Sequence, residues 1–269
     1  MQLKMSSGVH ISIEVHPNAW VRDIAFVHGN LASRRWWMPS LEYMKSWLPK
    51  NGAAGSVFLI EFPGCGLSQA PSSLEQVSMQ AWARDFMGFL RQLGKAPMDL
   101  VGHSTGGLIA ALMLGEAPDF FHRGIFLDSV GAKGIRFDSS MHQVFAAMKS
   151  SRELTAQVLG STIHDLSPAS TFFEEVLVPD AFLAVQNVGP WVLQALDQLD
   201  VRDQMARIQA EVLVLHGEHD NLLPRADSEE LARLIPRARF EELKGCGHCG
   251  NIENPKLWVQ KLVEFLGVS

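Results

Sequence analysis

Two hydrophobic patterns alternate along most of the chain. Short, continuous apolar runs are typical of strands that are covered on both faces of a sheet. Longer stretches between several of these runs carry apolar residues at helical spacing. Strands are expected at residues 24–27 and 56–61, at the apolar pair Leu100 and Val101, and at 124–129, 211–217 and 238–243. The helices are expected at 39–47, 77–93, directly after residue 104, at 225–234 and at 254–266.

Residues 9–15 follow a different pattern, because apolar and polar residues alternate there. Such alternation predicts a half-buried antiparallel strand at the edge of the sheet. Strands that otherwise alternate with helices predict an α/β fold with a mostly parallel sheet and helices on both faces. In such a sheet, functional loops lie at the carboxyl ends of the strands.

Residues 133–203 interrupt this alternation. They contain no convincing strand and are punctuated by glycine and proline, which predicts several short helices. Large apolar side chains recur there, among them Phe145, Phe172 and Trp191. An insertion between two strands has to lie over the strand ends, so we expect a helical lid. The predicted core domain then comprises residues 1–132 and 204–269.

Composition narrows the class of protein. A chain of 269 residues with 47% hydrophobic and 19% charged residues is long and apolar enough for one large α/β domain with an insertion. The net charge of −6 and the lack of a basic run argue against nucleic acid as a partner. No run approaches the about 18 apolar residues of a membrane span. Three cysteines are too few for a disulfide framework, so a cytoplasmic protein is expected.

The candidate chemistry centres on Gly102-His103-Ser104-Thr105-Gly106. An apolar strand precedes this segment and an apolar helix follows it, which is the context of a G-x-S-x-G nucleophile elbow. Small residues on both sides of the serine allow neighbouring backbone to approach closely. A glycine-rich turn that only packs, or that binds a phosphate, would have the same pattern, so the other motifs must decide.

A serine hydroxyl is a weak nucleophile and needs a base, which in turn needs an orienting carboxylate. Asp220 follows the strand expected at 211–217, and His248 follows the strand expected at 238–243. The chain order Ser104, Asp220, His248 is the order found in hydrolases with a G-x-S-x-G elbow.

With these residues the chain resembles the α/β-hydrolase superfamily, in its lidded branch of serine esterases and thioesterases. The resemblance covers nearly the whole chain outside residues 133–203. It rests on five segments in the expected order: His28-Gly29-Asn30, Gly64-Cys65-Gly66-Leu67-Ser68, Gly102-His103-Ser104-Thr105-Gly106-Gly107, Gly217-Glu218-His219-Asp220 and Gly245-Cys246-Gly247-His248.

The resemblance implies roles for particular residues. Ser104 is the nucleophile, His248 the general base and then acid, and Asp220 the orienting acid. The backbone amides of Thr105 and Asn30 form the oxyanion hole, with Leu31 as the fallback for the second donor.

Two positions depart from the family pattern. Relatives often have an apolar residue or glycine at Asn30, so its side chain is a candidate for substrate contact. Glu61 stands where aspartate is common, in a structural turn outside the triad.

Rival residues remain as alternatives. Asp128 follows the strand at 124–129 and could replace Asp220 as the acid. His28 and His103 flank the site and are expected to pack and form local hydrogen bonds, while Cys65 is expected to be a small buried hydrophobe. His216, His219, Cys246 and Cys249 superficially suggest zinc, but no second Cys-x-x-Cys pair completes a site. We expect no metal and no cofactor.

Taken together, the sequence predicts a serine hydrolase that cleaves an ester or thioester of a mainly apolar acyl group through an acyl-enzyme. The Phe- and Met-rich insertion suggests a pocket that discriminates by shape and burial. The predicted substrate-binding residues are Leu31, Trp37, His103, Phe145, Phe172 and Trp191.

Several related functions share this triad. A carboxylesterase, a carrier-bound thioesterase of a biosynthetic pathway, a lactonase and a carbon–carbon bond hydrolase are not separated by the sequence. A thioesterase of that kind would need a carrier protein as a partner, for which Arg34 and Arg35 are the only basis found. A ligand receptor that retains the triad is the alternative from another class. The sequence predicts no oligomeric state.

Overall fold

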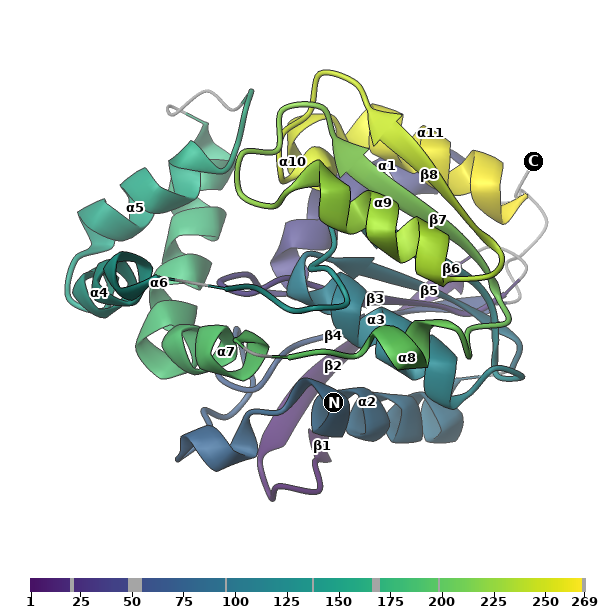
Figure 1. The fold of residues 1–269 in the computed structure, drawn as a ribbon, viewed down its shortest axis with the longest axis horizontal. Coiled ribbons are helices and arrows are strands. Elements are labelled where there is room, and N and C mark those ends of the chain that lie inside the picture. Colours follow the sequence, from purple (N-terminus) through teal and green to yellow (C-terminus); the bar gives the residue numbers. More distant parts are fainter. Residues whose placement is uncertain are drawn as a thin grey trace.

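The computed structural model describes residues 1–19, 22–47, 55–94, 96–136, 138–165, 170–197 and 199–267. They form an eight-stranded sheet in the order β1-β2-β4-β3-β5-β6-β7-β8 (Figure 1). The strands are β1 (Gln2–Lys4), β2 (His10–Ala19), β3 (Ile24–Val27), β4 (Gly55–Ile60), β5 (Met98–His103), β6 (Phe121–Leu127), β7 (Glu211–Gly217) and β8 (Ala238–Leu243). The pairs β1–β2 and β2–β4 are antiparallel and all others are parallel, which confirms the predicted α/β fold.

Helices cover both faces of the sheet. On one face, Trp37 and Trp258 belong to a buried cluster beneath α1 (Met38–Met44) and α11 (Pro255–Leu266). On the other face, a larger cluster lies beneath α2 (Met79–Leu93), α3 (Thr105–Glu116) and α9 (Arg225–Leu234). Shorter elements complete these layers: the 3-10 helices Arg34–Trp37, Lys45–Trp47 and Leu74–Gln76, and helices α8 (Arg202–Met205) and α10 (Gly250–Glu253).

Local capping explains where two of the helices begin. The Ser78 hydroxyl accepts a hydrogen bond from the Ala81 N–H at the start of α2. The side chain of Asn254 accepts one from the Leu257 N–H, with Pro255 in the first turn of α11.

The prediction that residues 9–15 form the edge strand is wrong. β1 pairs with β2 on its outer side, so β2 is the second strand of the sheet. Ser12 is therefore buried, and its N–H donates to the Ser68 hydroxyl at 2.8 Å. β1 has only three residues, too few to produce a readable pattern.

Between β6 and β7 the described residues form helices and no strand. They are α4 (Ser139–Met148), α5 (Arg152–Ser161), the π-helical segment Phe173–Leu177, α6 (Val178–Asn187) and α7 (Gly189–Leu196). Figure 1 shows α4, α5, α6 and α7 gathered at one end of the sheet, on the left of the view. We call α4–α7 the inserted helices.

Within the described ranges, no single helix is long and apolar enough to cross a membrane. The bent pair Phe173–Asn187 and Gly189–Leu196, with an angle of 68° between its parts, reaches that length and composition only when the two are taken together. Its apolar side chains, such as Leu177, Val185 and Leu193, are buried inside the protein.

The central layers meet backbone to backbone at two glycines. A Cβ on Gly106, in the first turn of α3, would lie 2.2 Å from the Val27 carbonyl oxygen of β3. A Cβ on Gly102, in β5, would lie 2.3 Å from the Gly106 carbonyl oxygen. Since none of these backbone atoms can move freely, α3 reaches its position only with glycine at both sites.

We therefore expect Gly106→Ala to lower the free energy of unfolding by about 1–3 kcal/mol or more, because α3 must shift away from β3. Gly88→Ala is the matched control, since Gly88 lies within α2 and has no atom within 4 Å of the added Cβ. There the helix propensity of alanine should raise stability by up to about 1 kcal/mol. Urea unfolding measures both, and equal effects would contradict this account of the packing.

Candidate active site

Ser104 lies between β5 and α3 in a strained backbone conformation, with φ 54° and ψ −122°. Its N–H donates to the Leu127 carbonyl at 3.0 Å, and its carbonyl accepts from the N–H groups of Gly107 and Val130. A non-glycine residue held at positive φ costs about 1–3 kcal/mol and persists only where its surroundings impose it. The turn at the carboxyl end of β5 therefore fixes where the hydroxyl stands.

The loop after β3 runs directly beside this serine. A Cβ on Gly29 would lie 2.9 Å from the Ser104 Cβ, so glycine is required for this approach. The Thr105 N–H is the first of α3, a position that lacks an intrahelical acceptor. The two predicted oxyanion donors, Asn30 and Thr105, therefore come from segments that flank the hydroxyl, and both residues line the same cavity as Ser104.

Asn30 also organises its own loop. Its Oδ1 accepts the Leu31 N–H at 3.0 Å, and its Nδ2 donates to the Gly189 carbonyl of α7 at 3.3 Å. Leu31 sits at φ 59°. The Leu31 N–H, the fallback oxyanion donor, is thus already engaged, and the Asn30 amide group ties the loop to the inserted helices.

His248 and Asp220 lie in the loops after β8 and β7, 28 residues apart along the chain, and meet at the site. Nδ1 of His248 donates to Oδ2 of Asp220 at 2.8 Å. Oδ1 of Asp220 accepts from the N–H groups of Leu222 and Leu223. Burial acts to raise the pKa of Asp220, but the hydrogen bond and charge of His248 together with these amides outweigh it and hold the pKa below its usual value. Asp220 is therefore ionised beside the imidazole.

Two further histidines near the site are neutral and structural. His103 donates from Nε2 to the His248 carbonyl at 2.8 Å, and burial lowers its pKa to about 3. His28 donates from Nδ1 to the Gly29 carbonyl and accepts the Phe62 N–H on Nε2, and burial lowers its pKa to about 4. Both therefore remain uncharged at neutral pH and orient the backbone of the site.

Glu253 of α10, which the sequence analysis did not single out, holds both sides of His248. Its Oε2 accepts the Gly247 N–H at 2.8 Å, and its Oε1 accepts the Cys249 N–H at 3.0 Å. Oε2 also accepts the N–H groups of His164 and Asp165, which follow α5. One carboxylate thus joins the His248 loop to the inserted helices, a role that no local sequence pattern reveals.

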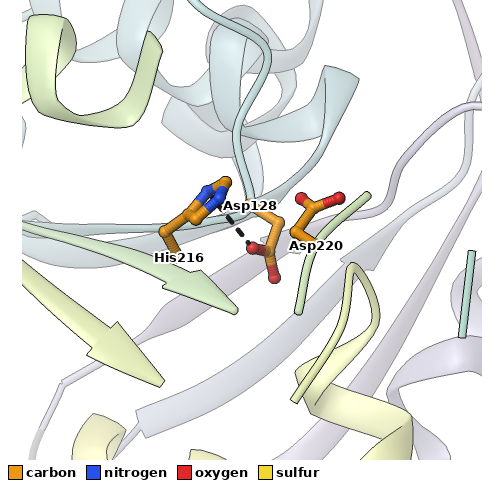
Figure 2. Close-up of side chains that lie close together, drawn as sticks. All are labelled: Asp128, His216 and Asp220. Atoms are coloured by element: carbon orange, nitrogen blue, oxygen red, sulfur yellow. Dashed lines mark ion pairs between the residues drawn. The ribbon is translucent and has the colours of Figure 1, made fainter. Parts of the chain in front are cut away.

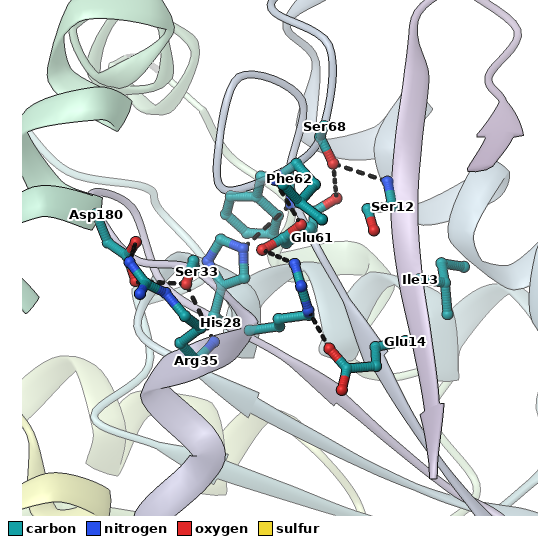
Figure 3. Close-up of polar contacts among 12 residues, drawn as sticks. Ser12, Ile13, Glu14, His28, Ser33, Arg35, Glu61, Phe62, Ser68 and Asp180 are labelled. Carbon is teal, nitrogen blue, oxygen red and sulfur yellow. Dashed lines mark hydrogen bonds and ion pairs between the residues drawn. The ribbon is translucent and has the colours of Figure 1, made fainter. Parts of the chain in front are cut away.

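Ion pairs and hydrogen bonds connect the segment that follows β3 to its neighbours (Figure 3). Arg34 lies between Glu14 and the buried Glu61, with Nη1 2.7 Å from Oε1 of Glu61. Oε2 of Glu61 accepts the Leu67 N–H at 2.9 Å. A Cβ on Gly66 would lie 1.8 Å from Oε1 of Glu61, which explains the glycine in that motif. Burial raises the pKa of Glu61, while Leu67 and Arg34 act in the opposite direction.

A second ion pair connects the inserted helices to the same loop. Asp180 of α6 is buried and accepts the Ser33 hydroxyl at 2.6 Å and the Arg35 Nε at 3.2 Å (Figure 3). Asn187, near the end of α6, donates to the Gly64 carbonyl at 3.1 Å. The position of the inserted helices is therefore tied to the segment that carries Asn30.

Ser104 and His248 open onto one cavity of about 170 Å³. The other described residues that line it are mostly apolar, and none of them carries a charge: Asn30, Leu31, Trp36, His103, Thr105, Ile135, Met141, Phe145, Val158, Leu159, Ser161, Thr162, Leu193, Leu196, Leu222, Leu223 and Cys249. The Thr162 carbonyl, after α5, accepts the His248 N–H at 3.2 Å. The inserted helices therefore form one wall and contact the His248 backbone.

The predicted substrate-binding residues divide into two groups. Leu31, His103 and Phe145 line the cavity. Trp37 does not, because it is fully buried on the opposite face of the sheet, where its ring lies 5.0 Å from that of Phe26. Its neighbour Trp36 lines the cavity instead, since successive residues of a 3-10 helix point about 120° apart.

Phe172 and Trp191 were also predicted to bind substrate and are not among the cavity-lining residues. Both are partly buried and pack against the large core cluster. The inserted helices instead present Leu193 and Leu196 of α7, and Val158 and Leu159 of α5, to the cavity. Side-chain size alone could not identify which face of each helix turns inward.

Asp128, the alternative acid, is near Asp220 but is not the hydrogen-bond partner of His248. Its Oδ1 accepts the Gly217 N–H at 2.7 Å. Within the described ranges, Asp128, His216 and Asp220 form a group whose potential ligand atoms all lie within 4.8 Å of one another (Figure 2). Cys246 and Cys249 are free, buried thiols, and burial raises the pKa of each.

A family model described as the alpha/beta hydrolase family matches residues 24–261. A 2-hydroxy-6-oxo-2,4-heptadienoate hydrolase of Pseudomonas putida is 26% identical, over 96% of this chain and 94% of that one.

Solved structures of similar fold include an esterase from Exiguobacterium antarcticum, with a TM-score of 0.82 and 19% identity over 99% of both chains. An enol-lactonase from Burkholderia xenovorans matches with a TM-score of 0.79 and 21% identity, over 99% of this chain and 100% of that one. At these identities the two likenesses establish the fold alone.

The Glu253 contacts lead to a prediction about the His248 loop. In Glu253→Gln one acceptor oxygen becomes an NH₂ donor that faces backbone N–H groups. We expect the free energy of unfolding to fall by about 1–3 kcal/mol. Turnover of an ester substrate should fall by about 10- to 100-fold, because the imidazole loses its fixed position.

Glu264→Gln is the matched control, since Glu264 accepts a single side-chain hydrogen bond from Gln260 on α11. Its effect on unfolding should stay within about 0.5 kcal/mol. Urea unfolding and steady-state kinetics compare the two variants. Indistinguishable variants would show that the Glu253 carboxylate does not hold the loop.

Proposed function

The chain belongs to the alpha/beta hydrolase family, and from this premise we propose that it is a serine hydrolase that cleaves an ester or thioester of a short, uncharged acyl group. One observation carries the proposal. Nδ1 of His248 is hydrogen-bonded to the ionised Asp220, and both His248 and the strained Ser104 line the same apolar cavity. This arrangement leaves Nε2 of His248 as the base that faces the cavity.

In the proposed reaction, the Ser104 Oγ attacks the acyl carbonyl while Nε2 of His248 takes the hydroxyl proton. The N–H groups of Thr105 and Asn30 stabilise the tetrahedral oxyanion. The intermediate collapses, and His248 returns the proton to the departing alcohol or thiol. Water, activated by the same imidazole, then hydrolyses the acyl-enzyme, which releases the acid and regenerates Ser104.

The cavity supports the proposed substrate class. Its volume of about 170 Å³ lies below the roughly 300–1,000 Å³ of sites for drug-sized ligands, which favours a short acyl group. No charged side chain of the described part of the chain lines it, so a carboxylate on the acyl chain would be buried without a partner. This favours an ester or thioester over the heptadienoate named for the Pseudomonas putida relative, which carries a carboxylate.

Two further observations bear on the alternatives. Arg34 and Arg35, the basis for a carrier-protein surface, are paired with carboxylates of this chain, namely Glu14, Glu61 and Asp180. A small-molecule substrate therefore fits better than a carrier-bound one. For the ligand-receptor alternative, the deciding property is whether Ser104 is acylated and turns over.

Replacing the nucleophile tests the proposal directly. A fluorophosphonate should add once to the wild-type protein, at Ser104, and not to Ser104→Ala. Ester hydrolysis by Ser104→Ala should fall by at least about 10⁴-fold with the fold intact, because the covalent step is lost. Intact mass, peptide mapping and circular dichroism provide the readouts. A folded, active Ser104→Ala protein would refute the proposal, and an unlabelled wild-type protein would favour the receptor.

The uncharged cavity leads to a second prediction. p-Nitrophenyl butyrate and mono-p-nitrophenyl succinate differ mainly in that a methyl group is replaced by a carboxylate. We expect kcat/KM to be at least about 30-fold lower for the succinate, equivalent to about 2 kcal/mol, because the carboxylate loses its water without gaining a cation. Release of p-nitrophenol measures both. Equal values would show that the acyl chain lies outside this cavity.

A further inference from the structure

Asp128 is a buried carboxyl with no role in the proposed mechanism. It follows β6 at φ 44°, and its side chain is completely shielded from solvent. Oδ1 accepts the Gly217 N–H at 2.7 Å, whereas Oδ2 has no hydrogen-bond partner among the residues that the structure describes. Figure 2 shows this carboxyl between His216 and Asp220. An ionised carboxylate with one bare oxygen beside a second carboxylate would be strongly destabilised.

The acceptor positions of Asp220 are nearly filled. An ionised carboxylate offers about four lone-pair positions. The N–H groups of Leu222 and Leu223 occupy two on Oδ1, and Nδ1 of His248 occupies one on Oδ2. One acceptor position remains, and Asp128 is the neighbour with an unpartnered oxygen. A single proton between the two carboxyls would satisfy both.

We propose that Asp128 is a carboxylic acid in the resting enzyme and donates the Oδ2–H hydrogen bond to the Asp220 carboxylate. Asp128 is then a positioning residue. It fixes the carboxylate that orients His248, and by donating to Asp220 it makes that carboxylate less basic. The proton taken from Ser104 therefore stays on the imidazole. This inference rests on the proposed function, and it adds Asp128 as the residue that positions Asp220 of the proposed triad.

Other partners for Asp128 fit less well. Nδ1 of His216 lies 3.6 Å from Oδ1 of Asp128, too far for a hydrogen bond, and 3.1 Å from the Ser228 hydroxyl. Burial also lowers the pKa of His216, so it is not a cation that could pair with Asp128. A metal ion bound by this group would compete with Nδ1 of His248 for the Asp220 carboxylate. A proton fits the contacts without displacing any of them.

The electrostatics agree with this geometry. Burial raises the pKa of Asp128 well above its usual value, and the charge of Asp220 raises it further, whereas the Gly217 N–H acts in the opposite direction. The other titratable groups that act on it or respond to it are Glu253 on α10 and the thiols of Cys246 and Cys249. None of these supplies a positive charge.

The Asp128→Asn variant tests whether Asp128 is protonated or ionised in the wild-type protein. An asparagine amide can replace the O–H as donor to Asp220, and asparagine tolerates the positive φ. We expect kcat to fall by less than about tenfold, and Asp128→Ala, which lacks a donor, to lose clearly more activity. Asp220→Asn is the matched control and should lose at least about 10³-fold, since it disrupts the orientation of His248.

Infrared difference spectra test the proton without relying on activity. At neutral pH the wild-type protein should show the carbonyl band of a protonated carboxyl, sensitive to deuterium exchange, that is absent from Asp128→Asn. A missing band, or an Asp128→Asn protein as inactive as Asp220→Asn, would mean that Asp128 is ionised. Stoichiometric metal in the wild type that is lost in Asp128→Asn, by elemental mass spectrometry, would also overturn the proposal.

The pH dependence of stability gives a readout on the wild type itself. The unfolded Asp128 carboxyl ionises near pH 4, whereas the folded one keeps its proton at higher pH. Folding then takes up a proton, so this group should make wild-type stability fall as pH rises above about 4. Asp128→Asn should remove about one proton from that slope, and an unchanged slope would contradict the proposal. If Ser104 took no fluorophosphonate, the proposed function would fail while the band and slope still tested Asp128.

Discussion

The close approach of three backbone segments around Ser104 is the constraint on which the rest of the structure depends. β5 ends, α3 begins and the loop after β3 passes within a space that leaves no room for a Cβ at Gly29, Gly102 or Gly106. Ser104 itself is held at positive φ by hydrogen bonds to the neighbouring strand and loop. The same packing that fixes the sheet and its central helix therefore places the Ser104 hydroxyl beside the loop that carries Asn30.

The inserted helices and the segments next to them are connected to this centre by several hydrogen bonds. Asp180 accepts the Ser33 hydroxyl, the Asn30 side chain donates to the Gly189 carbonyl, and the Thr162 carbonyl accepts the His248 N–H. Glu253 joins the segment after α5 to the amides on both sides of His248. Movement of the inserted helices would therefore displace the proposed oxyanion donors and the proposed base. Access to the cavity and the geometry of the site are linked in this way.

The charges of the site are arranged in layers. The cavity wall is uncharged, the imidazole is backed by the ionised Asp220, and the protonated Asp128 that we propose lies behind that carboxylate. His28 and His103 are held neutral by burial, so they add no charge close to Ser104. A single negative charge then faces the imidazole, which is what an orienting acid requires.

The sequence by itself determined most of the secondary structure and the candidate residues that belong to short local motifs. Apolar runs and helical spacing predicted most strands and helices, and glycines around Ser104, together with Asp220 and His248 after their strands, predicted the triad. The sequence did not determine the place of β1, the choice of Trp36 over Trp37, or the contacts of Glu253 and Asp128. A three-residue strand has no readable period, and two adjacent tryptophans look alike until a helix turns one inward. The partners of a buried carboxylate come from segments far apart along the chain, so only the tertiary structure decided them.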